Sequence, residues 1–267
     1  MSQKIAVIGV GNMARSIIAG VLASELVVDR FYLYDTNKDA YAVYAENSNF
    51  TVCSSIAEAV NSADLVLLSV KPQNFPQVLE DIKATDGHRE KLYVTIAAGI
   101  TVQSVSDALN GATVIRALPN LPMTVGMGVS AICKSNTATA DEFEFVKQMF
   151  MSAGSVIVID EAEMNRIIGV TSSSPAYVFK FINAICMGAQ AQGLDGSALL
   201  SAVCDMVIGS ATLLKNSGEN PETLISRVAS KGGTTEQALI KLDTGEFDRI
   251  VESAMVACTN RAEELGK

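Results

Sequence analysis

The sequence predicts an α/β fold, a doubly wound parallel sheet, followed by an all-helical second domain. Short apolar strands alternate with helical segments over the first part of the chain. One of these strands, residues 65–70 (LVLLSV), is continuously apolar, as in a sheet covered on both faces. After about Asp160 the strand patterns end and only helical patterns follow. We therefore expect two domains, 1–160 and 161–267.

In the first domain, short apolar runs predict strands, and a 3.6-residue periodicity predicts the helices between them. The expected strands are 4–9, 31–34, 65–70, 92–96, 113–115, 128–133 and 155–159, and the expected helices are 12–23, 38–46 and 141–151. Alternation of this kind implies right-handed crossovers between parallel strands.

The second domain is expected to contain helices at 161–169, 175–192, 197–216, 221–228, 235–242 and 247–265. They are rich in small residues, and several are apolar on more than one side. Helices of that kind need an additional partner, which predicts a homo-oligomer interface. The alternative is a well-packed bundle within one chain.

Composition argues against several classes of protein. The chain has 267 residues, of which 49% are hydrophobic and 18% charged, so disorder is not expected. A net charge of -9 argues against nucleic acid or an anionic membrane as the main partner. The apolar run 198–214 contains Asp205, which favours a buried helix over a membrane span.

The cysteines and the histidine limit location and chemistry. The five cysteines form no CxxC pair, and the chain opens into a strand without a signal-peptide pattern, so we expect reduced thiols and a cytoplasmic location. The single histidine, His88, lies in a polar turn. A histidine-dependent acid–base mechanism and a metal site are therefore not expected.

A glycine motif follows the first strand. Gly9, Gly11 and Ala14 occupy the three positions of G-x-G-x-x-G/A, between a strand and a helix. In this setting Gly9 allows the tight turn, Gly11 lets the backbone approach a pyrophosphate, and Ala14 permits close helix packing. The start of the helix, with Asn12 and Met13, supplies N–H groups to the phosphates. The motif predicts a Rossmann-like site for NADH or NADPH.

Asp35 ends the second strand at the distance expected for a residue that binds the adenosine ribose, which favours NAD. It also suits a cap for the following turn. Asn37 and Lys38 come next and suit the phosphate of NADP, so both cofactors stay open, with NAD slightly favoured.

Other predicted site residues end later strands, where open sheets bind ligands. Ser69, Lys71 and Pro72 follow one strand, and Ala97 follows the next. Lys71 has the alternative role of a solvated loop charge. Pro119 and Asn120 form a rigid loop, either bordering a substrate cleft or serving as a structural turn.

A second polar loop lies more than 200 residues after the glycine motif. The segment 230–235 (SKGGTT) joins two helical segments, and its hydroxyls and free N–H groups suit a small carboxylate. The chain thus presents a cofactor end and a substrate end. Ser230, and likewise Ser173, has an alternative role as a helix N-cap.

Together, GxGxM, VKPQ, AAGI, RALPN-x-P, SPAYVF and SKGGTT resemble the pyrroline-5-carboxylate reductase family over essentially the whole chain. The resemblance implies a Rossmann-like domain, a helical dimerisation domain, and NAD(P)H-dependent reduction of a cyclic imine carboxylate to L-proline in proline biosynthesis. It also implies a homodimer or a ring of dimers.

The resemblance assigns roles to individual residues. Thr235 and Ser230 would act in catalysis, and the substrate would meet Ser173, Pro119, Asn120, Gly232, Gly233 and Thr234. The dinucleotide would meet Gly11, Asn12, Met13, Lys71, Pro72 and Ala97, in addition to Gly9, Asp35 and Ser69, which the glycine motif and the strand ends predict.

One segment departs from the family pattern. Where the family shows GSGPAY, this chain has serines at Ser172 and Ser174. Serine would be strained where the backbone needs a positive φ, or would narrow the pocket where the backbone approaches substrate.

The expected chemistry is positioning. An imine nitrogen is basic and takes a proton before hydride arrives, so the enzyme works by proximity. Two alternative functions are possible from the sequence. One is a β-hydroxyacid dehydrogenase-like reductase, with Lys180 as the candidate catalytic residue, and the other is a non-catalytic NAD(P)-binding homologue.

Overall fold

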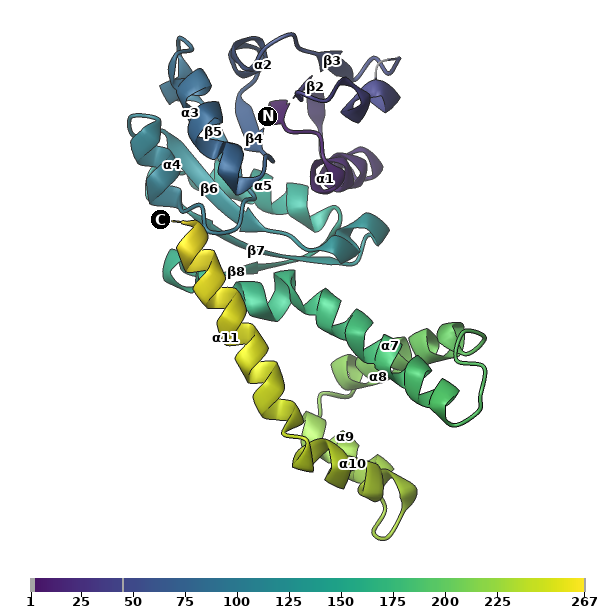
Figure 1. Cartoon of the computed structure of the whole chain (residues 1–267). Helices are drawn as coiled ribbons and strands as arrows, with labels where there is room; N and C mark the ends of the chain where they lie inside the picture. Colours follow the sequence, from purple (N-terminus) through teal and green to yellow (C-terminus); the bar gives the residue numbers. More distant parts are fainter. Residues whose placement is uncertain (1–2, 45, 267) are drawn as a thin grey trace. The chain divides into compact units, whose positions relative to one another are not determined.

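The computed structural model describes residues 3–44 and 46–266 (Figure 1). The chain forms two compact units. The first runs through Ser173 and resumes at Val256, and the second is Ser174–Met255. The expected division after residue 160 followed the end of the strand patterns, whereas the compact units follow packing, and residues 161–173 pack with the sheet.

The first unit contains an eight-stranded sheet with the order β3-β2-β1-β4-β5-β6-β7-β8. The strands are β1 Gln3–Ile8, β2 Val28–Tyr34, β3 Phe50–Val52, β4 Leu65–Leu68, β5 Leu92–Thr95, β6 Thr113–Leu118, β7 Gly128–Lys134 and β8 Gly154–Val158. The first six strands are parallel in the Rossmann order, which confirms the doubly wound prediction.

The sheet is not parallel throughout, because β7 pairs with β6 in the antiparallel sense. Only a short 3₁₀ segment, Leu121–Val125, connects them, whereas a parallel crossover needs a dozen or more residues and usually a helix. β8 is parallel to β7 and so shares its reversed direction. The uniformly parallel sheet expected from the alternation is therefore wrong at this edge.

Helices cover both faces of the sheet. They are α1 Asn12–Ala23, α2 Ile56–Ser62, α3 Phe75–Lys83, α4 Val102–Ala108, α5 Ala140–Met151 and α6 Met164–Ile167, followed by the π-helix Ile168–Ser172. One core cluster joins the sheet to α2, α3 and α4, and the other joins it to α1 and α5. The helix expected at 38–46 is wrong: Lys38–Ala40 and Ala42–Tyr44 are two separate 3₁₀ turns.

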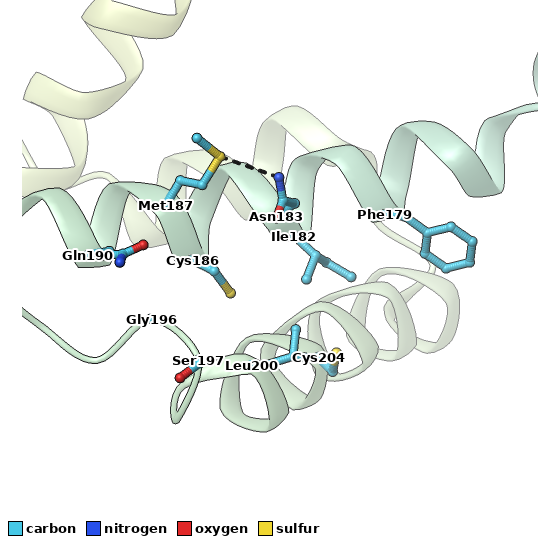
Figure 2. A pocket seen from close by; sticks show the side chains of 10 residues that line it. All are labelled: Phe179, Ile182, Asn183, Cys186, Met187, Gln190, Gly196, Ser197, Leu200 and Cys204. Carbon is cyan, nitrogen blue, oxygen red and sulfur yellow. Dashed lines mark hydrogen bonds between the residues drawn. The ribbon is translucent and has the colours of Figure 1, made fainter.

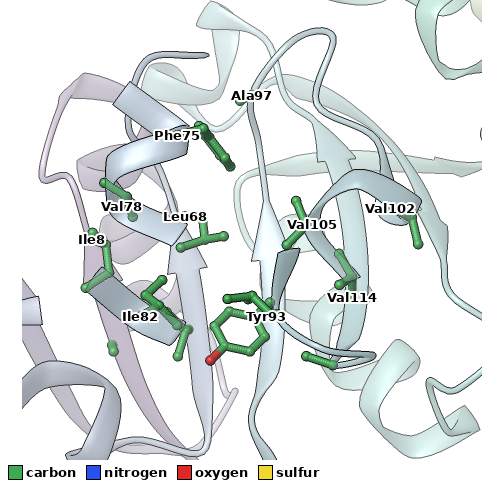
Figure 3. Packing of buried hydrophobic residues seen from close by; sticks show 14 of the residues in the cluster. Ile8, Leu68, Phe75, Val78, Ile82, Tyr93, Ala97, Val102, Val105 and Val114 are labelled. Atoms are coloured by element: carbon green, nitrogen blue, oxygen red, sulfur yellow. The ribbon is translucent and has the colours of Figure 1, made fainter. Parts of the chain in front are cut away.

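Strand β4 shows why its sequence is continuously apolar. Val66 and Leu68 belong to one cluster, and Leu65 and Leu67 belong to the other. Figure 3 shows the first cluster, where strand side chains such as Leu68 meet α3 and α4. Full burial of an aliphatic side chain contributes about 1.5–3 kcal/mol, so both layers hold this strand in place.

The helices of the second unit are α7 Ser174–Ala191, α8 Leu200–Ser217, α9 Pro221–Val228, α10 Thr234–Thr244 and the first part of α11 Phe247–Leu265. Val203 is its only buried hydrophobic residue among those described. Large apolar side chains such as Phe179, Met187 and Ile208 are more than half exposed, at 54%, 61% and 60%. A self-contained bundle is therefore wrong, because one chain leaves these faces uncovered.

None of the helices in the described part of the chain is long and apolar enough to cross a membrane.

Candidate active site

A groove of about 650 Å³ opens at the carboxyl ends of β1, β2 and β4. It brings together five of the residues predicted to contact a dinucleotide, namely Gly9, Gly11, Asp35, Ser69 and Lys71. A smaller cavity of about 320 Å³ adjoins the same turn; its lining includes Gly11, Asn12, Arg15 and Asp35. Ligands of open α/β sheets bind at this edge, where the strand order reverses.

Gly9 makes the close approach that shapes the groove. Its φ is +92°, and its N–H donates to the Tyr34 carbonyl at 2.9 Å. A Cβ atom at this position would lie 2.8 Å from the Ser69 carbonyl oxygen. Only glycine therefore lets β1 turn so tightly between the ends of β2 and β4.

Gly11 is the N-cap of α1, and no side chain caps this helix. The first-turn N–H groups of a helix have no partner within the helix, and they favour an anion. The first turn contains no acidic residue, and a Cβ atom on Gly11 would meet nothing within 4 Å. This uncapped helix start with open space before it fits a pyrophosphate.

The Asp35 carboxylate organises the turn after β2. One oxygen accepts the Val10 N–H at 2.7 Å, and the other accepts the Asn37 N–H at 2.8 Å. The capping role weighed for Asp35 is thus present. Contact with the ribose stays a prediction that this geometry permits, because each carboxylate oxygen retains acceptor capacity.

Other predicted cofactor residues lie outside the linings of these two cavities. Met13 is partly buried against the core, Pro72 begins a 3₁₀ turn, and Ala97 is only 5% exposed. Sequence reasoning missed the far wall of the groove, which includes Ile56, Gln77, Val78 and Asp81 from α2 and α3. Recognising the helices that follow β3 and β4 would have predicted these residues, because such helices start at the carboxyl ends of the strands.

The side chain of Asn120 links two elements of the first unit by hydrogen bonds. It is 6% exposed, its Oδ1 accepts the Val129 N–H at 2.9 Å, and its Nδ2 donates to the Thr171 carbonyl at 2.9 Å. The neighbouring Pro119 is also buried. The side chain therefore holds the π-helix, which leads to Ser173, against β7. Substrate contact by either residue stays a prediction.

The serines that replace the family's glycines are not strained. Among the described residues, Asn110 and Glu246 are the only non-glycine residues with positive φ. The strain considered for Ser172 and Ser174 is therefore wrong, because their backbone conformation suits any residue. Ser172 Oγ is buried without a hydrogen-bond partner, and the Ser173 N–H donates to the Ile168 carbonyl at 2.8 Å.

The loop 230–235 lies in the second unit and ends at the start of α10. Gly232 has a φ of +75°, and its N–H donates to Glu236 Oε2 at 2.8 Å. Gly233, whose N–H donates to the Ser230 carbonyl at 2.9 Å, is the N-cap and lacks a side-chain cap. The N-cap role weighed for Ser230 is therefore wrong. Thr234 and Thr235 form the uncapped first turn beyond it.

A further cavity, of about 470 Å³, lies between α7 and α8 (Figure 2). Ile182 and Cys186 of α7 face Leu200 and Cys204 of α8 there. Its polar side chains are uncharged, and Asn183 donates to the Met187 sulfur at 3.4 Å. This lining suits apolar packing and not an anionic ligand. No group of three or more potential ligands among His, Cys, Asp and Glu gathers in the described ranges to hold a metal ion.

Two family models match the chain. Residues 4–99 match the family described as NADP oxidoreductase coenzyme F420-dependent, and residues 161–265 match pyrroline-5-carboxylate reductase dimerisation.

Similar proteins cover the full chain. Pyrroline-5-carboxylate reductase of Escherichia coli is 32% identical, with 100% of each chain covered. The Arabidopsis thaliana reductase is 31% identical over 100% of this chain and 96% of its own. The structure of the reductase from Coxiella burnetii superposes with a TM-score of 0.89 at 28% identity and covers 100% of both chains. The chain therefore belongs to the pyrroline-5-carboxylate reductase family.

Proposed function

We propose that this protein reduces pyrroline-5-carboxylate to L-proline with NADH or NADPH, as the last step of proline biosynthesis. The observation that carries the proposal is the glycine turn at Gly9 and Gly11, which opens the groove before an uncapped helix. The full-length likeness to reductases of this name supports the choice of substrate.

In this proposal the chain binds and positions its two ligands. The first turn of α1 holds the pyrophosphate, and the strand ends around Ser69 and Lys71 border the rest of the dinucleotide. When bound, the nicotinamide supplies a hydride to the imine carbon. The nitrogen receives its proton from water, so the reaction needs no buried histidine.

The substrate loop supplies the complementary anion site. The uncapped first turn of α10 offers N–H groups to the substrate carboxylate, and the hydroxyls of Ser230 and Thr234 line the same loop. Thr235 orients the ring nitrogen through its hydroxyl. Substrate contacts are also proposed for Ser173, Pro119 and Asn120.

We further propose that the protein works as a homodimer, or as a ring of dimers, in the cytoplasm. The exposed apolar faces of α7 and α8 support the assembly, as does the match of residues 161–265 to a dimerisation family. Cysteines without a disulfide among the described residues are consistent with a reducing compartment.

A steady-state assay tests the function. Pyrroline-5-carboxylate is supplied with NADH or NADPH, beside keto acids as alternative substrates. Thr235→Ala should lower kcat/KM for the imine by about 10- to 100-fold, the usual range for losing one positioning contact, while dinucleotide binding stays unchanged. Thr244→Ala, at the other end of α10, is the matched control. Turnover of keto acids alone, or binding without turnover, would reject the proposed reaction.

A further inference from the structure

We infer that this enzyme prefers NADH to NADPH, because Asp35 is held at the position expected for a ribose ligand and two N–H groups of the turn after β2 are bonded within the turn. The inference rests on the proposed function, since it concerns the dinucleotide groove of the same enzyme.

Asp35 is held rigidly between the two cavities. It lines both of them, and its two oxygens accept the Val10 and Asn37 N–H groups at 2.7 and 2.8 Å. The carboxylate cannot rotate away without breaking one of these bonds. Each oxygen keeps an acceptor site, which suits the two adjacent hydroxyls of an unmodified ribose. A 2′-phosphate replaces one of those donors with a group of acceptors.

Two N–H groups of the turn after β2 are already bonded within the turn. The Asn37 N–H donates to Asp35, and the Asp39 N–H donates to Asn37 Oδ1 at 3.1 Å. These two N–H groups are therefore not free to bind an anion. Lys38, which suited the phosphate of NADP in sequence, lines neither cavity.

The charges lining the two cavities also oppose a second phosphate. The carboxylates outnumber the cations, with Asp35, Asp39 and Asp81 against Arg15 and Lys71. The guanidinium of Arg15 is partly engaged, since one of its nitrogens donates to the Ala40 carbonyl. A 2′-phosphate adds a charge of about −1.5 to −2 beside a fixed carboxylate. Repulsion in a partly desolvated groove should weaken NADPH by at least about tenfold relative to NADH.

Equilibrium binding tests this preference without turnover. Titration calorimetry of the full-length protein with NADH and NADPH should give a Kd ratio of about 10 or more in favour of NADH. Asp35→Asn removes the charge while keeping the size of the side chain, and should bring the ratio close to one. Asp29→Asn, an exposed residue in β2, the strand that precedes Asp35, is the matched control and should leave the ratio unchanged.

Competition between NADH and two adenosine nucleotides tests the same preference without any variant. In wild-type protein, 5′-AMP should displace NADH more effectively than adenosine 2′,5′-bisphosphate. Equal or tighter binding of NADPH, or tighter binding of the bisphosphate, overturns the inference while leaving the proposed reaction intact. Failure of both dinucleotides to bind overturns the inference together with the proposed function.

Discussion

The buried ion pair of Arg116 and Glu161 supports a sharp prediction about stability. Arg116 lies in β6, where its Nη1 is 2.8 Å from Glu161 Oε1 and its Nη2 is 2.7 Å from Asn165 Oδ1. The arginine side chain is 1% exposed, whereas the glutamate side chain is 35% exposed. Removing Glu161 therefore leaves an unpaired charge that is buried, whereas removing Arg116 leaves an unpaired charge that is partly exposed.

The difference in burial sets the order of the two effects. Glu161→Ala leaves a guanidinium with no route to water, and breaking a buried pair in this way costs about 3–5 kcal/mol. Arg116→Met fills the space with an apolar side chain and leaves a carboxylate that reaches solvent, so we expect a smaller loss of about 1–2 kcal/mol. The double variant should resemble Arg116→Met, because no buried charge is left unpaired.

Urea unfolding at one fixed protein concentration, followed by circular dichroism, measures these changes in the free energy of unfolding. Glu144→Ala is the control, since its pair with Lys147 is exposed and should contribute about 0–1 kcal/mol. If Glu161→Ala destabilises the protein less than Arg116→Met, or no more than the control, the reasoning from burial is refuted.

Two further predictions concern the glycine turn and a buried thiol. Gly9→Ala should cost about 1–3 kcal/mol of stability, because its φ is +92° and its Cβ would clash with Ser69. Gly11→Ala should instead leave the unfolding midpoint unchanged and weaken NADH binding in calorimetry; equal losses of stability in the two variants would contradict this difference. Burial, and then the hydrogen bond to Glu161, raises the pKa of the Cys133 thiol, so the folded protein keeps a proton that the unfolded chain releases. Stability should therefore fall as pH rises above about 8.5, and Cys133→Ala should flatten that decline in unfolding measured from pH 7 to 9.5; an unchanged slope would exclude this role.

Local signals were enough to predict several elements. The helices α1, α9 and α11 have the bounds that their periodicity and flanking residues predict. The glycine turn and Asp35 were also identifiable, because each depends on residues close together in the chain. The order of the motifs was enough to predict that Ser69 and Lys71 line the same groove as the glycine turn, since parallel strands end at one edge of the sheet.

The errors share a different cause. Strand direction at β7 depends on how the preceding connection packs, and the short strand β3 (Phe50–Val52) exists because β2 offers it an edge. The segment 38–44 forms 3₁₀ turns, with Asn37 capping the first of them. The strain considered at Ser172 depends on a backbone angle that residue identity does not fix.

The family, the fold class and the residues of the glycine turn were predictable from the sequence, because strand and helix periodicities and the glycine spacing act over a few residues. Only packing determined that side chains of α2 and α3 form the far wall of the groove, and how Asp35 is held. Packing also determined that Asn120 links the π-helix to β7, and that Val203 is the only fully buried hydrophobic residue of the second unit among those described. Those features arise from contacts between residues distant in the chain, and such contacts form only when the whole chain packs.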